Sequence, residues 1–139
     1  MTPDDRDAFA LALLLGVAGL THFAVPGPYD SIVPRRLPGP ARAWTYASGV
    51  AELAVAGAVA CRPTRAVGGL AAAALFVAVF PANVKMAIDW RRRSPLARAI
   101  AYSRLPLQAP LVWWSMRVAH AAGRPPSTRS HLGNTTEGS

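Results

Sequence analysis

Long apolar stretches alternate with short polar ones along this chain. Four of the apolar stretches are long enough to form helices that cross a bilayer, and they cover residues 8–25, 44–61, 66–90 and 97–121. An α-helix rises about 1.5 Å per residue, so 18 residues cover roughly 27 Å, close to the thickness of a hydrocarbon core. The pattern predicts an all-α fold, a four-helix transmembrane bundle over residues 8–121. Residues 1–7 form a polar N-terminus in this interpretation, and residues 122–139 form a disordered tail.

Prolines interrupt the pattern at two places. Residues 26–43 contain five prolines and three arginines among apolar side chains. Because this first loop is too apolar for a free linker, we expect it to lie at the membrane interface, with its arginines near lipid head groups. Pro81 falls inside the third apolar stretch and lacks a backbone N–H, so we expect a kink there.

Composition supports an integral membrane protein. Apolar residues make up 52% of the chain and charged residues only 16%, with a net charge of +8. Basic loops beside apolar spans contact anionic lipids or hold the topology, so we expect the bilayer of the cell membrane to be the first partner. No basic stripe is interleaved with aromatic residues, so we expect no nucleic-acid partner. Cys61 is the only cysteine, which excludes an intrachain disulfide and a CxxC redox motif.

Glu52 is the one charged residue in the stretch 44–61 and lies near its middle. An exposed carboxylate at the bilayer centre costs about 2.5–3.5 kcal/mol on insertion scales. Glu52 is therefore expected to face other protein, water or a ligand, or to be protonated. Ser48 lies four residues earlier and shares its helix face, and Gly49 permits a neighbouring backbone to approach the carboxylate.

The other polar interruptions fall in one half of the predicted bundle. With four spans, the first loop and the 91–96 loop lie on the same side of the membrane. The polar residues in the half of each span nearest those loops include Lys85, Asp89 and six that we expect to line a pocket: His22, Ser48, Glu52, Asn83, Arg104 and Gln108. This segregation predicts one polar pocket, facing the interior of the bundle, that contains all six.

Each pocket residue has a functional and a structural interpretation. Glu52 and His22 are the candidate catalytic or proton-exchanging groups, whereas Glu52 could instead pair with Arg104 and His22 could bond a backbone carbonyl. Asn83 and Gln108 suit uncharged ligand oxygens, but helix–helix hydrogen bonds explain them equally well. A metal site needs more ligands than His22, Glu52 and Asp89 offer, so we expect none.

A set of short motifs resembles the DoxX-like family of small bacterial membrane proteins. The motifs are Gly19-Leu20-Thr21-His22-Phe23, Pro34-x-x-Leu37-Pro38, Ser48-Gly49-x-x-Glu52, Phe80-Pro81-Ala82-Asn83 and Arg104-Leu105-Pro106-Leu107-Gln108. The resemblance implies a four-helix membrane bundle. Some members of that family are linked to quinone-dependent thiosulfate oxidation or to redox complexes. Members with thiol chemistry need paired cysteines, which this chain lacks.

Three hypotheses about function follow. The leading one is a component of a membrane redox complex that binds a small lipophilic molecule such as a quinone, with no covalent cofactor and with redox proteins as partners. The second is a non-catalytic assembly or chaperone-like membrane subunit whose polar residues join helices. The third is an intramembrane acid/base enzyme that acts on an isoprenoid-like lipid. The sequence alone leaves open whether the protein is an enzyme.

Overall fold

The computed structural model describes residues 1–125, and these residues form helices and no strands. The elements are α1 (Pro3–Ala24), α2 (Pro26–Ile32), α3 (Ala41–Ala60), the 3₁₀ turn η1 (Arg62–Thr64), α4 (Arg65–Ala78), α5 (Phe80–Asp89) and α6 (Pro95–Ala122). The predicted all-α class is confirmed. The predicted disordered tail lies outside the described residues from position 126 onward, and α6 continues into the first residue assigned to that tail.

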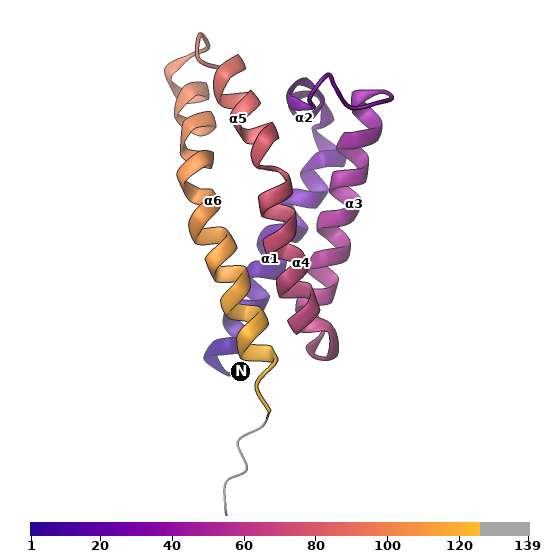
Figure 1. Ribbon diagram of the computed structural model, residues 1–139, viewed down its shortest axis with the longest axis vertical. Helices are drawn as coiled ribbons and strands as arrows, with labels where there is room; N and C mark the ends of the chain where they lie inside the picture. The colour runs from indigo at the N-terminus through magenta and orange to yellow at the C-terminus, as the bar shows by residue number, and fades with distance from the viewer. Residues whose placement is uncertain (126–139) are drawn as a thin grey trace, which may run out of the picture.

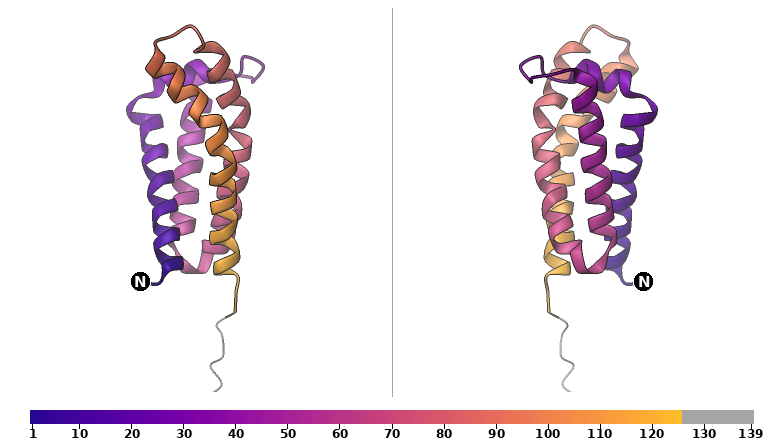
Figure 2. Two further views of the ribbon diagram at one scale, coloured as in Figure 1. Left: turned by 90° about the vertical axis from the view of Figure 1, so that its left-hand side faces the viewer. Right: turned by 90° about the vertical axis from the view of Figure 1, so that its right-hand side faces the viewer.

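The long helices run side by side along one axis (Figures 1 and 2). α3 packs against α1 and α4, and α6 packs against α4 and α5. The N-terminus, the η1 turn and the end of α6 lie at one end of the bundle, whereas α2 and the α5–α6 turn lie at the other (Figure 1). This connectivity places the first loop and the 91–96 loop at the same end.

Helix α1 begins earlier than the apolar pattern indicates, because polar residues cap it. The Thr2 hydroxyl accepts the backbone N–H of Asp5 at 3.1 Å, and the Asp5 carboxylate accepts the backbone N–H of Thr2 at 3.2 Å. This reciprocal capping box, with Pro3 at the first helical position, starts the helix within the segment predicted as a polar N-terminus.

The predicted third span is two helices. α4 ends at Ala78, and α5 starts at Phe80 with Pro81 in its first turn. Pro81 has no N–H to donate to the carbonyl of Val77, so the regular helical bonding stops there. Val79 keeps near-helical backbone angles and its carbonyl accepts the N–H of Asn83 at 3.1 Å, so the interruption is local, as expected for a kink. Pro106 and Pro110, in contrast, lie inside α6 without ending it.

The first loop contains a short helix. α2 starts with Pro26 at its first position and ends at Ile32, and it packs against α1, α3 and α5. Gly39 has a φ of +83°, in the left-handed region that glycine tolerates, and reverses the chain before α3. The loop therefore folds back over the end of the bundle.

Small side chains allow the helices to pack closely in the half of the bundle that carries the N-terminus and the η1 turn. The core contains Ala8, Leu11, Leu15, Val59 and Ala72, which are almost fully buried. A Cβ on Gly68 would lie 2.6 Å from the backbone nitrogen of Val59, and one on Gly69 would lie 2.8 Å from that of Ala119. α4 can therefore approach α3 and α6 closely only because these positions carry no side chain.

Charged residues join the helices at the end that carries the N-terminus. The Asp5 carboxylate accepts hydrogen bonds from Arg65 and from Arg62, both at 2.8 Å. Arg65 is itself buried and also donates to the carbonyl of Val59. The start of α1 is thereby attached to the turn between α3 and α4.

Two segments among the described residues combine the length and apolar composition needed to cross a membrane. They are α1, over Pro3–Ala24, and the segment Arg62–Asp89 that includes α4 and α5. α3 and α6 are also long, with 20 and 28 residues, but are not among these two segments.

Candidate functional site

A cavity of about 400 Å³ lies between the helices on the side of the bundle covered by α2. Its walls include His22 of α1, Glu52 of α3, Asn83 of α5 and Arg104 of α6. The remaining lining residues are Tyr29, Ile32, Val33, Pro34, Leu37, Trp44, Thr45, Ser48, Leu75, Ala78, Val79, Pro81 and Ala82. All four long helical segments therefore contribute to one mostly apolar chamber that contains a few polar groups.

Glycines position the two acid/base side chains. A Cβ on Gly49 would lie 2.8 Å from the Cβ of His22 and 3.0 Å from the carbonyl of Gly19. A Cβ on Gly19 would in turn lie 3.0 Å from the carbonyl of Gly49. α1 and α3 cross at this point with their backbones nearly in contact, which sets His22 beside Glu52 one turn further along α3.

Glu52 is buried, with 9% of its surface exposed. Its Oε2 lies 3.4 Å from Nδ1 of His22, yet no hydrogen bond reaches this oxygen from any described residue. Buried polar atoms are nearly always hydrogen-bonded to protein or to another molecule. The Glu52 carboxylate therefore has an unused acceptor position inside the protein.

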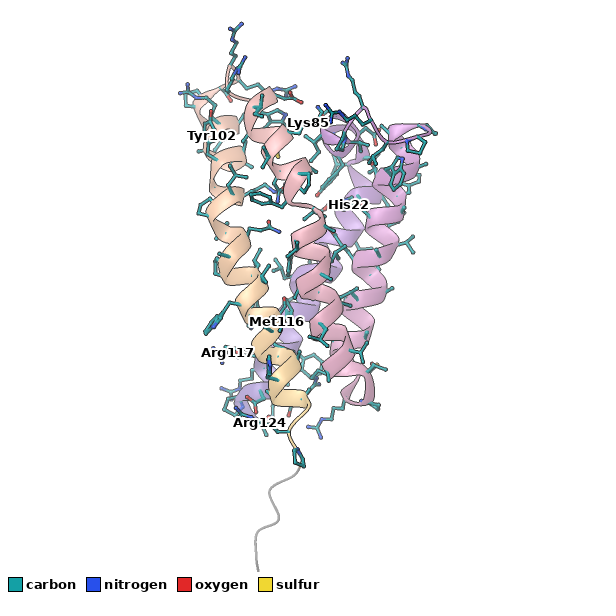
Figure 3. All side chains as sticks on the ribbon, viewed as in Figure 1. His22, Lys85, Tyr102, Met116, Arg117 and Arg124 are labelled. Atoms are coloured by element: carbon teal, nitrogen blue, oxygen red, sulfur yellow. The ribbon has the colours of Figure 1, made fainter. Side chains whose placement is uncertain are left out.

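His22 is held by two contacts. Its Nδ1 lies 2.8 Å from the carbonyl of Ala18, so the tautomer with a proton on Nδ1 donates there. The ring stacks on Tyr29 of α2 with 3.8 Å between centroids, and the Tyr29 hydroxyl bonds Thr21 at 2.6 Å. This tautomer leaves Nε2 as an acceptor. His22 lies well inside the bundle, whereas Lys85 lies nearer the end that carries α2 (Figure 3).

Arg104 reaches the same cavity without an acidic partner among the described residues. Its guanidinium contacts the sulfur of Met86 at 3.9 Å, which is a weak acceptor. The alternative in which Glu52 and Arg104 form an ion pair does not describe this structure. A cation and an acid thus line one chamber with space between them.

The two amides join α5 to α6. Asn83 Nδ2 donates to Gln108 Oε1 at 3.0 Å, and Gln108 Nε2 has no partner among the described residues. Asn83 lines the cavity but Gln108 does not. Five of the six residues predicted to share a pocket therefore line this cavity, and the sixth supports one of them.

Sequence reasoning missed the residues that α2 contributes. Tyr29 and Ile32 line the cavity, and Asp30 holds α2 against α3 through Thr45 Oγ1 at 2.6 Å and Arg42 Nε at 2.7 Å. Lys85 Nζ donates to the carbonyl of Ser31 at 3.0 Å and also pairs with Asp89. The one available signal was the set of apolar residues interrupting the first loop.

The alternatives to the Glu52 cavity are less suited to be a functional site. A larger hollow of about 720 Å³ lies outside α2, but Asp30, Lys85 and Asp89 in its wall are already paired with protein groups. Within residues 1–125, no three His, Cys, Asp or Glu side chains gather as a metal ion would need. The Glu52 cavity is therefore the better candidate.

Comparison with known proteins corrects the resemblance described above. The chain matches the family model described as "Domain of unknown function (DUF8561)" over residues 11–119. Comparisons with curated proteins and with solved structures give no significant match. The DoxX-like assignment is wrong. The short motifs behind it have local packing roles, such as the helix crossing at Gly49 and the helix break at Pro81, which helical bundles of different ancestry can share. The chain belongs to the DUF8561 family of domains of unknown function.

Proposed function

We propose that the chain is a multi-pass protein of the cell membrane, a four-helix transmembrane bundle in which α1, α3, the α4–α5 pair and α6 each span the bilayer. The outer surface supports this. Leu13, Val17 and Leu20 on α1 are more than half exposed, although they lie in the middle of a helix. A helix whose buried face and exposed face are both apolar is typical of a membrane span. At about 1.5 Å per residue even α3 is long enough to cross roughly 30 Å of hydrocarbon.

Within that bundle, the Glu52 cavity binds a small lipophilic molecule that has a polar head. The observation that carries this proposal is the buried Glu52 oxygen without a hydrogen-bond partner on the wall of a cavity of about 400 Å³. Leaving a buried polar group unpaired costs about 1–3 kcal/mol, and more for a charged one. A ligand that donates a hydrogen bond to Glu52 removes this cost.

A quinone in its oxidised or reduced form fits the polar groups of the wall. A quinone carbonyl accepts a hydrogen bond from the Arg104 guanidinium, and a hydroquinone hydroxyl donates to Glu52 or to Nε2 of His22. The Glu52–His22 distance of 3.4 Å allows the pair to exchange protons with such a hydroxyl after small movements. The chain would then act as one component of a membrane redox complex, with electrons exchanged by a partner protein.

The assembly-subunit hypothesis explains these contacts less well. If the polar residues served only to join helices, Glu52 would be expected to bond a neighbouring helix. Asn83 and Gln108 do form such a bond between α5 and α6. Glu52 Oε2 lies 3.4 Å from Nδ1 of His22 on α1 but accepts no hydrogen bond among the described residues. The carboxylate is therefore better explained by a ligand than by helix association.

An acid/base enzyme, the third hypothesis from the sequence, is the second candidate here, because an imidazole lies beside the carboxylate. Glu52 and His22 could together move a proton on an isoprenoid-like lipid. Turnover of a supplied lipid by the purified protein, without partners, distinguishes this activity from simple binding.

Lipids that co-purify with the protein test the binding proposal. We expect mass spectrometry of the extract to show one lipophilic molecule, a quinone in the leading hypothesis, enriched over its level in the source membrane. Glu52→Gln should abolish the enrichment, because the neutral amide presents different hydrogen-bonding groups to the head. Asp4→Asn is the matched control, since Asp4 is an exposed acid in the first turn of α1, far along the chain from the cavity. An extract with the composition of the membrane in the wild type would contradict the proposal.

A further inference from the structure

We infer that the ligand of the Glu52 cavity is a single-tailed bilayer amphiphile with an uncharged head, and that it enters sideways between α3 and the α4–α5 break, leaving its tail in the bilayer. This inference rests on the proposed function and deepens it. The closed sides of the cavity, its volume and the charges in its wall support it.

α2 closes the cavity toward the end of the bundle that also carries the α5–α6 turn. It is attached to three other helices: through Tyr29 to Thr21 of α1, through Asp30 to Thr45 and Arg42 of α3, and through Ser31 to Lys85 of α5. Ile32 of α2 is buried beneath these contacts, against Met86 and Ala101. A ligand arriving from the aqueous side at this end would have to break several of these bonds.

Close packing closes the cavity toward the other end. Below the cavity, α4 lies so near its neighbours that Gly68 and Gly69 leave no room for a Cβ against α3 and α6. Ala56 and Ala72, buried in the same region, fill the interior of the bundle. No path of ligand width therefore runs along the bundle axis in this direction.

One lateral side of the cavity, between α3 and the α4–α5 break, carries exposed apolar residues. Trp44 of α3, Ala78 at the end of α4 and Pro81 at the start of α5 line the cavity and are exposed. α3 packs along α4 but not along α5, because α5 leans toward α6 above the break (Figure 1). The helix break at Pro81 thus creates a lateral opening, and its rim is apolar.

The volume limits what can fit inside. A cavity of about 400 Å³ is near the lower end of the range of roughly 300–1,000 Å³ that holds drug-sized ligands. A ring or another compact head fits, whereas a long alkyl or isoprenoid chain does not. Such a chain would pass the apolar rim and remain among lipid tails, at no desolvation cost.

The charges favour an uncharged head. Glu52 and Arg104 line the same cavity without a bond between them, and when Glu52 is ionised their opposite charges balance. A head with a net charge would leave one unit of charge uncompensated in a low-dielectric chamber. A neutral group that accepts from Arg104 and donates to Glu52, such as a phenol or an alcohol, satisfies both.

Two probes that differ only in their tail test the inference in nanodiscs. The probes are a benzoquinone without a tail and the same ring with a decyl tail, and quenching of tryptophan fluorescence reports binding. Ala78→Phe places a bulky side chain at the opening, and Ala74→Phe adds the same bulk one turn earlier, at an exposed position outside the cavity. We expect Ala78→Phe to weaken binding of the decyl probe about tenfold and that of the tailless probe less than twofold. Ala74→Phe should change neither.

The outcomes distinguish the inference of lateral entry from the proposal that the Glu52 cavity binds a ligand. Equal effects of Ala78→Phe on the two probes, or none on the decyl probe, would overturn lateral access while leaving binding of the head intact. If neither probe binds the wild type, the quinone-type ligand fails and the inference fails with it. A decyl probe with a diazirine in its tail gives a check without mutation. Crosslinks to Trp44, Ala78 or Pro81 are expected, whereas crosslinks to α2 would contradict the inference.

Discussion

Gly49 of α3 and His22 of α1 lie so close that a Cβ on the glycine would be 2.8 Å from the Cβ of the histidine. This contact is what allows an imidazole on one helix to approach a carboxylate on another. It also makes the geometry of the site sensitive to a single methyl group.

Gly49→Ala should therefore destabilise the protein and separate α1 from α3. Overpacking of a close contact costs about 1–3 kcal/mol. Gly16→Ala is the control, because a Cβ at Gly16 meets no atom within 4 Å. Gly16→Ala should be neutral or stabilising by about 0.5–1 kcal/mol, through helix propensity. Unfolding in detergent, followed by circular dichroism, measures both. Equal behaviour of the two variants would show that the crossing is looser than described.

Asp5→Asn should lower the midpoint of thermal unfolding clearly more than Asp7→Asn. Asp5 accepts hydrogen bonds from Arg62 and from the buried Arg65, so its removal leaves a guanidinium without its carboxylate. Asp7 pairs with Arg117 at an exposed site, where ion pairs contribute little. A thermal shift assay on the purified variants makes the comparison. A larger effect for Asp7→Asn would contradict this account of how α1 is anchored.

The attachment of α2 should weaken in acid. A hydrogen bond from the Thr45 hydroxyl and the Arg42 guanidinium beside it lower the pKa of the Asp30 carboxyl below its ordinary value of 3.8. A lowered folded-state pKa means that the stabilisation is present above the ordinary value and is lost as the pH falls through the folded-state pKa. The protection of α2 amides from hydrogen exchange, corrected for the change of the intrinsic exchange rate with pH, should fall over that acidic range.

Asp30→Asn is the matched variant for that experiment. It should exchange faster than the wild type at neutral pH and lose the acid-dependent step. An unchanged acid step in this variant would assign the pH dependence to another group.

The four-span topology can be tested with the single native cysteine. Cys61 is exposed beside the η1 turn, at the same end as the N-terminus. A membrane-impermeant maleimide should label Cys61 from one side of the membrane. In a Cys61→Ser background, Ser94→Cys in the α5–α6 turn should be labelled from the other side only. Labelling of both positions from one side would exclude the proposed topology.

Much of the helix pattern could be predicted because apolar runs and prolines act locally. The Ser48–Glu52 spacing and the glycine at position 49 also indicated a shared, closely approached helix face. The stacking of Tyr29 on His22 could not be predicted, because it depends on how α2 folds over the bundle. The sequence also could not show that Glu52 and Arg104 are not bonded to one another, because two charges at similar depth can either pair or stay apart. The family assignment failed because motifs that serve packing do not specify ancestry.

An experimental structure in nanodiscs with the decyl-benzoquinone probe tests the central claim most directly. The account predicts density for the ring within hydrogen-bonding distance of the Glu52 carboxylate, in the cavity that Arg104 also lines. A structure with that cavity empty at saturating probe, and with Glu52 bonded to Arg104 instead, would contradict it.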